Sequence, residues 1–316
     1  MVSIFSWETL FVVLIVLTSL FLGFLVYLKN RKKNVNFYFF FICLFSALFI
    51  GSAYLSEFFP RTNPFLSIVL TKITFGAVIW WSVFLFLFSL AFPEGKKISS
   101  KISLILFSVG IFLTILTLFT PLFIKDIKIQ PWGFDVVYGK LFLLFFGTFF
   151  LTLLALFFFY ILKRYKKANF IEKKQFKYFF LGLLTFCGLI AIVNSIFPYL
   201  IGTQQYYRLG NYSAIFFLGF TAYAIIAKHL FDIKILLTEL LVGVISLLLL
   251  IQTFLAPNLF WKVIDGSIFL LFLLFGYYLI KATLKEVQLR EETEKLSQAK
   301  SEFISMASHQ LRTPLT

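Results

Sequence analysis

Charged residues are scarce in this chain of 316 residues: only 14% are Asp, Glu, Lys or Arg, whereas 60% are hydrophobic. Ordinary soluble domains contain about 45–50% apolar and roughly 25% charged residues, so this chain has too few polar side chains to cover a water-soluble globule. No single core of this size would hide its 47 phenylalanines. The composition therefore excludes a soluble enzyme and a disordered protein, and it indicates a polytopic membrane protein.

Cysteine is nearly absent, and acidic residues are few. The two cysteines, Cys43 and Cys187, lie inside apolar runs without metal-ligand spacing, which excludes a disulfide-stapled scaffold, a redox pair and a zinc site. The net charge is +15. Such a charge often indicates nucleic-acid binding, but here the basic residues stand between apolar runs, as membrane topology requires. We therefore expect no nucleic-acid partner.

Long apolar runs dominate the rest of the chain. A helix needs about 20 apolar residues to cross the hydrocarbon core, and the runs lack the alternation of a barrel strand. The sequence therefore predicts an all-α fold, a polytopic transmembrane helical bundle of about nine spans. The nine runs cover residues 8–28, 37–57, 65–92, 102–120, 139–162, 176–199, 209–227, 235–255 and 259–280.

The placement of lysine and arginine predicts the orientation of these spans. With nine spans, 22 basic residues fall on the side of the C-terminus and six on the other side, and Lys72 lies within a span. Because basic residues concentrate on the cytoplasmic side, we expect the N-terminus outside and the C-terminus in the cytoplasm. No basic residue precedes the first span and no small-residue cleavage site follows it, so we expect an uncleaved anchor.

The composition changes after Ile280. Residues 281–300 form a charged, strongly helix-forming segment without Gly or Pro. The apolar residues at heptad spacing are Leu289, Leu296, Ala299, Phe303 and Met306. Glu292 occupies one further core position. Ile280, Leu284 and Val287 follow a shifted frame. The pattern favours a short coiled coil with a frame break over a lone solvated helix.

The last sixteen residues, SEFISMASHQLRTPLT, resemble the H-box of sensor histidine kinases, which is the phosphoacceptor helix of their dimerisation and phosphotransfer domain. The motif is matched at His309, Leu311, Arg312, Thr313, Pro314 and Leu315. The upstream residues 300–303, with Met306 and Ala307, are also similar to the family's approach to the histidine.

The residue types suit phosphoryl transfer. A neutral imidazole is nucleophilic near pH 7, so His309 could accept a phosphoryl group. Thr313 follows one helical turn later on the same face, and Pro314 should bend the helix and free the carbonyl of Gln310. The family usually has Glu or Asp where this chain has Gln310, and an amide cannot accept the ring proton. The general base is therefore unassigned.

The resemblance implies a sensor histidine kinase of a two-component system. In that function, ATP phosphorylates His309, and the phosphoryl group passes to an aspartate of a response regulator. It also implies a homodimer, and ATP with Mg²⁺ in a catalytic domain. No glycine-rich phosphate loop occurs in the chain, so we expect that domain beyond Thr316. The alternatives are a membrane transporter and a catalytically silent receptor with an oligomerising coiled coil.

The stretch YAIIAKHLFDIKI (Tyr223 to Ile235), the basic loop before the sixth span and Pro198 resemble the seven-transmembrane N-terminal region of some histidine kinases. We therefore divide the chain into a sensor region at 1–234, a transmembrane hairpin at 235–280, a coiled-coil helix at 281–300 and the start of the phosphoacceptor helix at 301–316. The resemblance implies the cell membrane of a bacterium or archaeon. The signal is not readable from the sequence, although a small or lipophilic molecule suits so apolar a bundle.

Three further hypotheses concern the membrane region. The ninth span is expected to continue as one helix to His309, which would carry movement to the acceptor. Lys72 could pair with Glu57 or extend its stem to the outer headgroups. In the loop 121–140, the turn residues around Trp132 and the flanking Ile and Val residues favour a strand hairpin, as a ligand lid or as an interfacial anchor.

Overall fold

The structure is a computed structural model that describes residues 7–93, 98–130, 133–168, 170–197, 200, 207–226, 232–255 and 258–312. It is 84% helical, which confirms the all-α class. The chain forms two compact units, Met1–Lys228 and His229–Thr316. Each unit is considered by itself.

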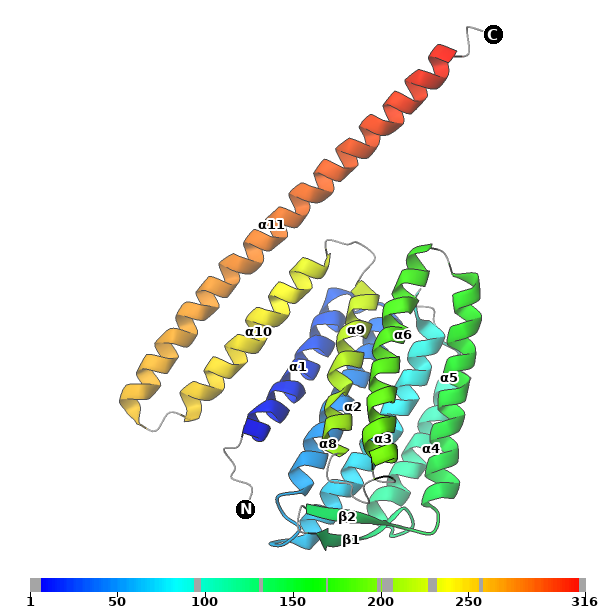
Figure 1. The fold of residues 1–316 in the computed structure, drawn as a ribbon, viewed down its shortest axis with the longest axis vertical. Helices are drawn as coiled ribbons and strands as arrows, with labels where there is room; N and C mark the ends of the chain where they lie inside the picture. Colours follow the sequence, from blue (N-terminus) through cyan, green and yellow to red (C-terminus); the bar gives the residue numbers. More distant parts are fainter. Residues whose placement is uncertain are drawn as a thin grey trace. The chain divides into compact units, whose positions relative to one another are not determined.

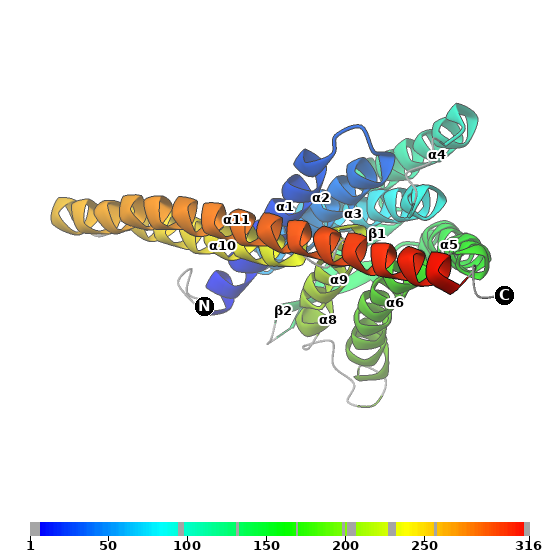
Figure 2. The ribbon, with the colours of Figure 1, turned by 90° about the horizontal axis from the view of Figure 1, so that it is seen from above.

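The first unit is a helical bundle with one strand hairpin (Figure 1). Its elements are α1 (Trp7–Lys29), α2 (Asn34–Ser56), α3 (Pro64–Ala91), α4 (Ser100–Phe119), β1 (Ile124–Gln130), β2 (Gly133–Tyr138), the π-helical η1 (Phe142–Gly147), α5 (Thr148–Lys167), α6 (Phe170–Ala191), the π-helical η2 (Ile192–Ile196), α8 (Tyr207–Tyr212) and α9 (Ala214–Ile226). The second unit contains α10 (Asp232–Leu255) and α11 (Leu259–Arg312). The two helices lie side by side over the length of α10 (Figures 1 and 2).

Helix α3 is the most enclosed of the long helices, and it packs against α2, α4 and α5. It begins after Asn63, whose Oδ1 accepts a hydrogen bond from the backbone N–H of Leu66 at 3.1 Å, and Pro64 occupies the first turn. Aromatic rings fill the space between α3 and its neighbours. Phe88 stacks on Phe179 of α6 with ring centroids 5.5 Å apart. The abundance of phenylalanine is thus partly explained by packing inside the bundle.

Glycines allow several helix pairs to approach closely. A Cβ at Gly182 of α6 would lie 2.7 Å from the Cβ of Phe220 in α9, and one at Gly23 of α1 would lie 2.6 Å from the Cβ of Cys43 in α2. Since non-bonded carbon atoms favour separations of about 3.5–4.0 Å, neither position has room for a side chain.

Each predicted apolar run falls largely on helix. By length and composition, six helical segments of the described chain could cross a membrane: Glu8–Leu28, Asn34–Ser56, Pro64–Ala91, Ser100–Phe119, Thr148–Lys167 and Leu259–Leu289. Two shorter apolar helices, Gln175–Ile190 and Thr238–Phe254, fall below that length. The span count of nine and the orientation stay predictions.

Candidate functional site

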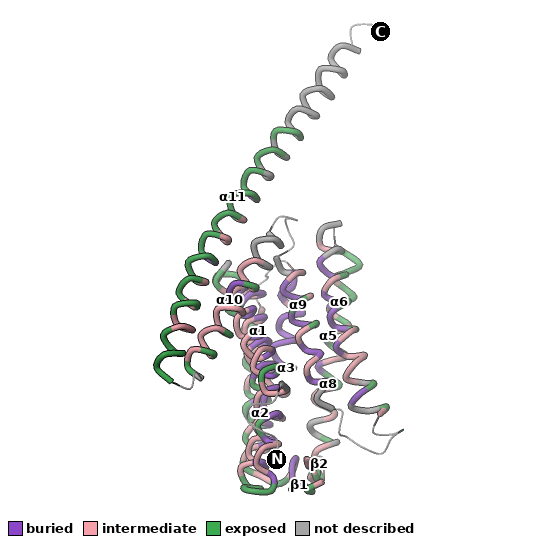
Figure 3. Tube along the Cα trace, turned by 60° about the vertical axis from the view of Figure 1, so that its left-hand side comes forward, coloured by how far each residue is buried: buried purple, intermediate pink, exposed green. Residues whose placement is uncertain are grey.

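Helix α11 joins the last apolar run to the predicted phosphoacceptor segment without a break. It contains 54 residues from Leu259 to Arg312, and at about 1.5 Å per residue it is about 80 Å long. The predicted continuity of the ninth span with the His309 segment is therefore confirmed. Figure 3 shows that the described side chains along most of α11 are exposed within this single chain.

One face of α11 packs against α10. A Cβ at Gly276 would lie 2.4 Å from the Cγ1 of Val242, so the two helices meet closely at this level. Towards the turn between them, the side-chain amide of Gln252 donates to Oδ1 of Asp265 at 3.1 Å. These contacts fix which face of α11 its own hairpin partner covers.

The residues predicted to carry phosphoryl transfer lie at the far end of α11. His309, Gln310 and Arg312 belong to the helix, whereas Thr313 and Pro314 lie outside the described residues. Leu289 and Leu296 of the predicted coiled-coil seam are 54% and 73% exposed, so the partner helix α10 does not cover them. The role of His309 and the pairing of two helices stay predictions.

A group of polar side chains joins α1, α2 and α8 at one end of the first unit. The hydroxyls of Thr9 and Tyr54 share a hydrogen bond of 2.7 Å, and Tyr212 donates to Oε1 of Glu8 at 3.4 Å. Glu57 follows directly after α2. Burial, and secondarily the charge of Glu8, raises the pKa of the Glu57 carboxyl to about 9. Sequence analysis missed this cluster, although polar residues at the ends of adjacent runs were its visible signal.

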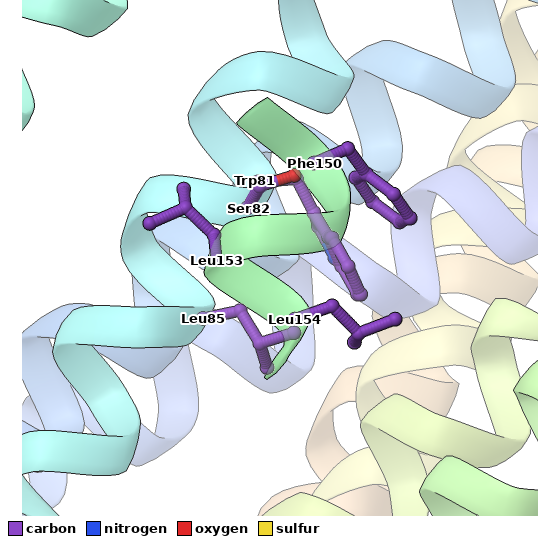
Figure 4. Close-up of a pocket in the computed structure, with 6 residues that line it drawn as sticks. All are labelled: Trp81, Ser82, Leu85, Phe150, Leu153 and Leu154. Atoms are coloured by element: carbon purple, nitrogen blue, oxygen red, sulfur yellow. The ribbon is translucent and has the colours of Figure 1, made fainter. Parts of the chain in front are cut away.

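A small apolar opening lies between α3 and α5 (Figure 4). It is narrow, with a cavity volume of only about 10 Å³. Its lining residues are Trp81, Ser82 and Leu85 of α3 with Phe150, Leu153 and Leu154 of α5. The Ser82 hydroxyl donates to the carbonyl of Val78 at 2.7 Å, so this hydroxyl already has a partner. The opening suits apolar atoms and not a charged group.

Two basic side chains of the bundle bind carbonyl oxygens at helix ends. The Nζ of Lys72 donates to the carbonyls of Thr120 at 2.9 Å and Leu118 at 3.3 Å, at the end of α4. Lys72 thus uses main-chain carbonyls and not the Glu57 carboxylate that the sequence suggested. Arg164 of α5 similarly donates to the carbonyls of Leu90 and Phe92 at the end of α3. Both contacts satisfy oxygens that lack partners at a helix C-terminus.

The predicted hairpin in the loop 121–140 is present. Strands β1 and β2 pair antiparallel, with Ile127 opposite Val136, and Pro131 and Trp132 lie outside the described residues. One face of the hairpin is buried through Ile124 and Phe134. The hairpin therefore packs onto the bundle end, and its use as a lid or as an anchor stays open.

Among the residues that the structure describes, no group of three or more His, Cys, Asp or Glu side chains could hold a metal ion.

In comparisons with known proteins, residues 11–234 match the family model of the N-terminal 7TM region of histidine kinase. No curated protein and no solved structure matches the chain. The family match covers more than two thirds of the sequence and includes most of the first unit, Met1–Lys228.

Proposed function

The chain belongs to the family that carries the N-terminal seven-transmembrane region of histidine kinases, and from this premise we propose that the complete protein is a sensor histidine kinase. The protein is a multi-pass membrane protein. In the proposed function, the bundle detects a signal and controls ATP-dependent phosphorylation of His309. The observation that carries this proposal is α11, a single helix that begins in the membrane hairpin and includes His309.

The proposed chemistry has two transfers. In the first, a ring nitrogen of neutral His309 attacks the γ-phosphorus of ATP, an N–P bond forms, and the bond to the ADP oxygen breaks. The ring proton then leaves the imidazolium, and Gln310 cannot take it because an amide is not a base at this pH. In the second transfer, the phosphoryl group passes to an aspartate of a response regulator. Mg²⁺ held with ATP in the kinase domain would neutralise the phosphate charge.

The proposal also includes the placement of the protein. We expect a homodimer in the cell membrane, with α11 emerging on the cytoplasmic side, where ATP and the response regulator are available. The basic residues between the apolar runs support this orientation.

The test is phosphorylation of the complete protein in membranes with labelled ATP. The label should be acid-labile, as an N–P bond requires, and His309→Gln should abolish it. The chain provides a matched control, since His229 is its only other histidine. His229→Gln should retain the label, and label that persists in His309→Gln would show that the acceptor is another residue.

A further inference from the structure

A π-helical turn joins the strand hairpin of the first unit to helix α5. In this turn, η1 (Phe142–Gly147), each backbone hydrogen bond spans five residues instead of four, so η1 contains one residue more than an α-helix would need there. Thr148, the first residue of α5, donates its hydroxyl to the carbonyl of Leu144 within η1. In an α-helix the amide of Thr148 is the partner of that carbonyl, so the hydroxyl provides a donor where the wider turn displaces the amide.

Main-chain hydrogen bonds tie the segment before η1 to the segment before β1. The backbone N–H of Gly139 donates to the carbonyl of Phe123 at 2.9 Å, and that of Leu141 donates to the carbonyl of Leu122 at 3.1 Å. A Cβ at Gly139 would lie 2.1 Å from the carbonyl oxygen of Leu122, so the two segments are in direct contact. A residue added between β2 and α5 would therefore break this pairing.

The side chains at this junction form one cluster with α3. Phe142 of η1 stacks on Tyr138 of β2 with ring centroids 4.1 Å apart, and its ring meets that of Phe75 in α3 edge-on at 5.6 Å. Phe142 also packs against a core that contains Ile79 of α3 and the fully buried Phe123. The position of the hairpin on the bundle thus depends on the state of η1.

Helix α5 is held beyond η1, at its other end and along its buried face. Arg164 donates to the carbonyls of Leu90 and Phe92 at the end of α3, and Phe157 and Ile161 are fully buried. If η1 became a regular α-helix, its extra residue would have to move into α5 or towards the hairpin. Moving it into α5 would turn that helix by about 100° and break these contacts. The extra residue would therefore move towards the hairpin and release the base of the hairpin from the bundle.

We propose that η1 is a joint with two states. In the π-helical state the hairpin is docked on the bundle, and in the α-helical state the extra residue has moved to the hairpin side and the hairpin is released. The contacts that carry this inference all lie within the first unit. The role of the joint in signalling rests on the proposed kinase: a signal that holds or lifts the hairpin would change the contact of η1 with α3.

Thiol labelling of the complete protein in membrane fragments tests the two states, in a background with Cys43→Ala and Cys187→Ala. Ile127→Cys reports release of the hairpin, because the native side chain on the buried face of β1 is only 9% exposed. Deletion of Leu144 removes the extra residue, so η1 should become α-helical with the hairpin docked, and Ile127→Cys should react severalfold more slowly. Lys128→Cys is the control, because its native side chain is exposed and its reaction rate should not change.

Thr148→Val should act in the opposite direction. It removes the hydroxyl that holds η1 and nearly keeps the side-chain volume, so Ile127→Cys should react severalfold faster. Thr185→Val is the matched control, because Thr185 makes the same kind of hydrogen bond, to the carbonyl of Leu181 at 2.8 Å, within the regular helix α6. Equal reaction rates in the parent, the Leu144 deletion and Thr148→Val would overturn the inference. A melting temperature far below that of the parent after the deletion would likewise show that η1 holds no spare residue.

Phosphorylation of His309 from labelled ATP separates this inference from the proposed function. The Leu144 deletion and Thr148→Val should change the amount of phosphorylated protein in opposite directions from the parent. If the thiol reaction of Ile127→Cys changes as expected and phosphorylation does not, the joint has no role in signalling and the inference is wrong, while the kinase stands. If the parent itself is not phosphorylated, the proposed function is wrong, and the thiol reaction still decides whether the joint exists.

Discussion

At the scale of single residues, close helix contacts in the bundle depend on positions without a side chain. Gly182 shows this best, because its neighbour Phe220 leaves no room for even a methyl group. Interiors of this density respond to small volume changes, since neighbouring atoms cannot yield without loss of packing.

Gly182→Ala should therefore destabilise the first unit by about 1–3 kcal/mol, as overpacking usually does. The measurement is the apparent melting temperature in detergent. Gly188→Ala is the control in the same helix, because no atom lies within 4 Å of a Cβ built there. Alanine favours helix over glycine, so that variant should melt at the same or a higher temperature. Equal loss in both variants would contradict the close-contact explanation.

Glu57 should make stability depend on pH. The pKa of its carboxyl is about 9 in the folded protein, above the value near 4.3 expected after unfolding. Between these values the folded state binds the proton and the unfolded state does not, so this contribution falls as pH rises towards 9. Glu57→Gln removes this dependence.

The Glu57→Gln variant should thus melt higher than the parent protein at pH 8, and the difference should shrink as pH falls towards 4. The expected gain is on the order of a few kcal/mol at most. Melting curves of both proteins across that pH range provide the measurement. A difference that does not vary with pH would show that Glu57 acts through packing and not through its charge.

At the scale of elements, α11 is a continuous helix that connects the membrane hairpin to His309. In the proposed kinase, a rotation at the membrane end would reach His309 in the same phase only if the number of residues between them keeps the heptad register. An insertion of seven residues adds almost two full turns, so the heptad register of the following residues is kept. An insertion of two residues rotates the following residues by about 200° and one of three by about 300°, so both break the register.

Insertion of seven helix-forming residues beside Lys295 should therefore preserve the change in His309 phosphorylation between activating and non-activating conditions. Insertion of two or three residues should abolish the response or lock activity on or off. Phosphorylation of His309 in membranes is the measurement, with expression level as its control. Identical behaviour of all insertions would rule out transmission through the helix.

Much of the element pattern was predictable from sequence for physical reasons. The apolar runs predicted helices, because a membrane segment must satisfy its backbone hydrogen bonds internally. The turn residues around Trp132 predicted a strand hairpin. Two features were not predicted. The partner of Lys72 is a pair of main-chain carbonyls, which no residue pattern encodes, and the cluster of Glu8, Tyr54 and Glu57 forms only through tertiary packing.

At the scale of the whole molecule, the orientation in the membrane decides whether the proposed chemistry is possible. Cysteines engineered at Ser297 and, separately, at Asp126 in β1 probe the two predicted sides. In intact cells, a membrane-impermeant thiol reagent should label Asp126→Cys and leave Ser297→Cys unlabelled until the cells are opened. Labelling of Ser297→Cys from outside would contradict the orientation and, with it, access of ATP to His309.

Because α11 is long, a small tilt at its membrane end moves its distal end by a larger distance. Its apolar segment ends at Leu289, and the helix continues to Arg312, about 35 Å further. Pivoting at the bilayer surface by only about 5° would swing the distal end sideways by about 3 Å, comparable to the reach of one hydrogen bond. Angular changes too slight to repack the bundle would thus be magnified into a displacement large enough to bring a nucleotide within or beyond attacking distance of the imidazole.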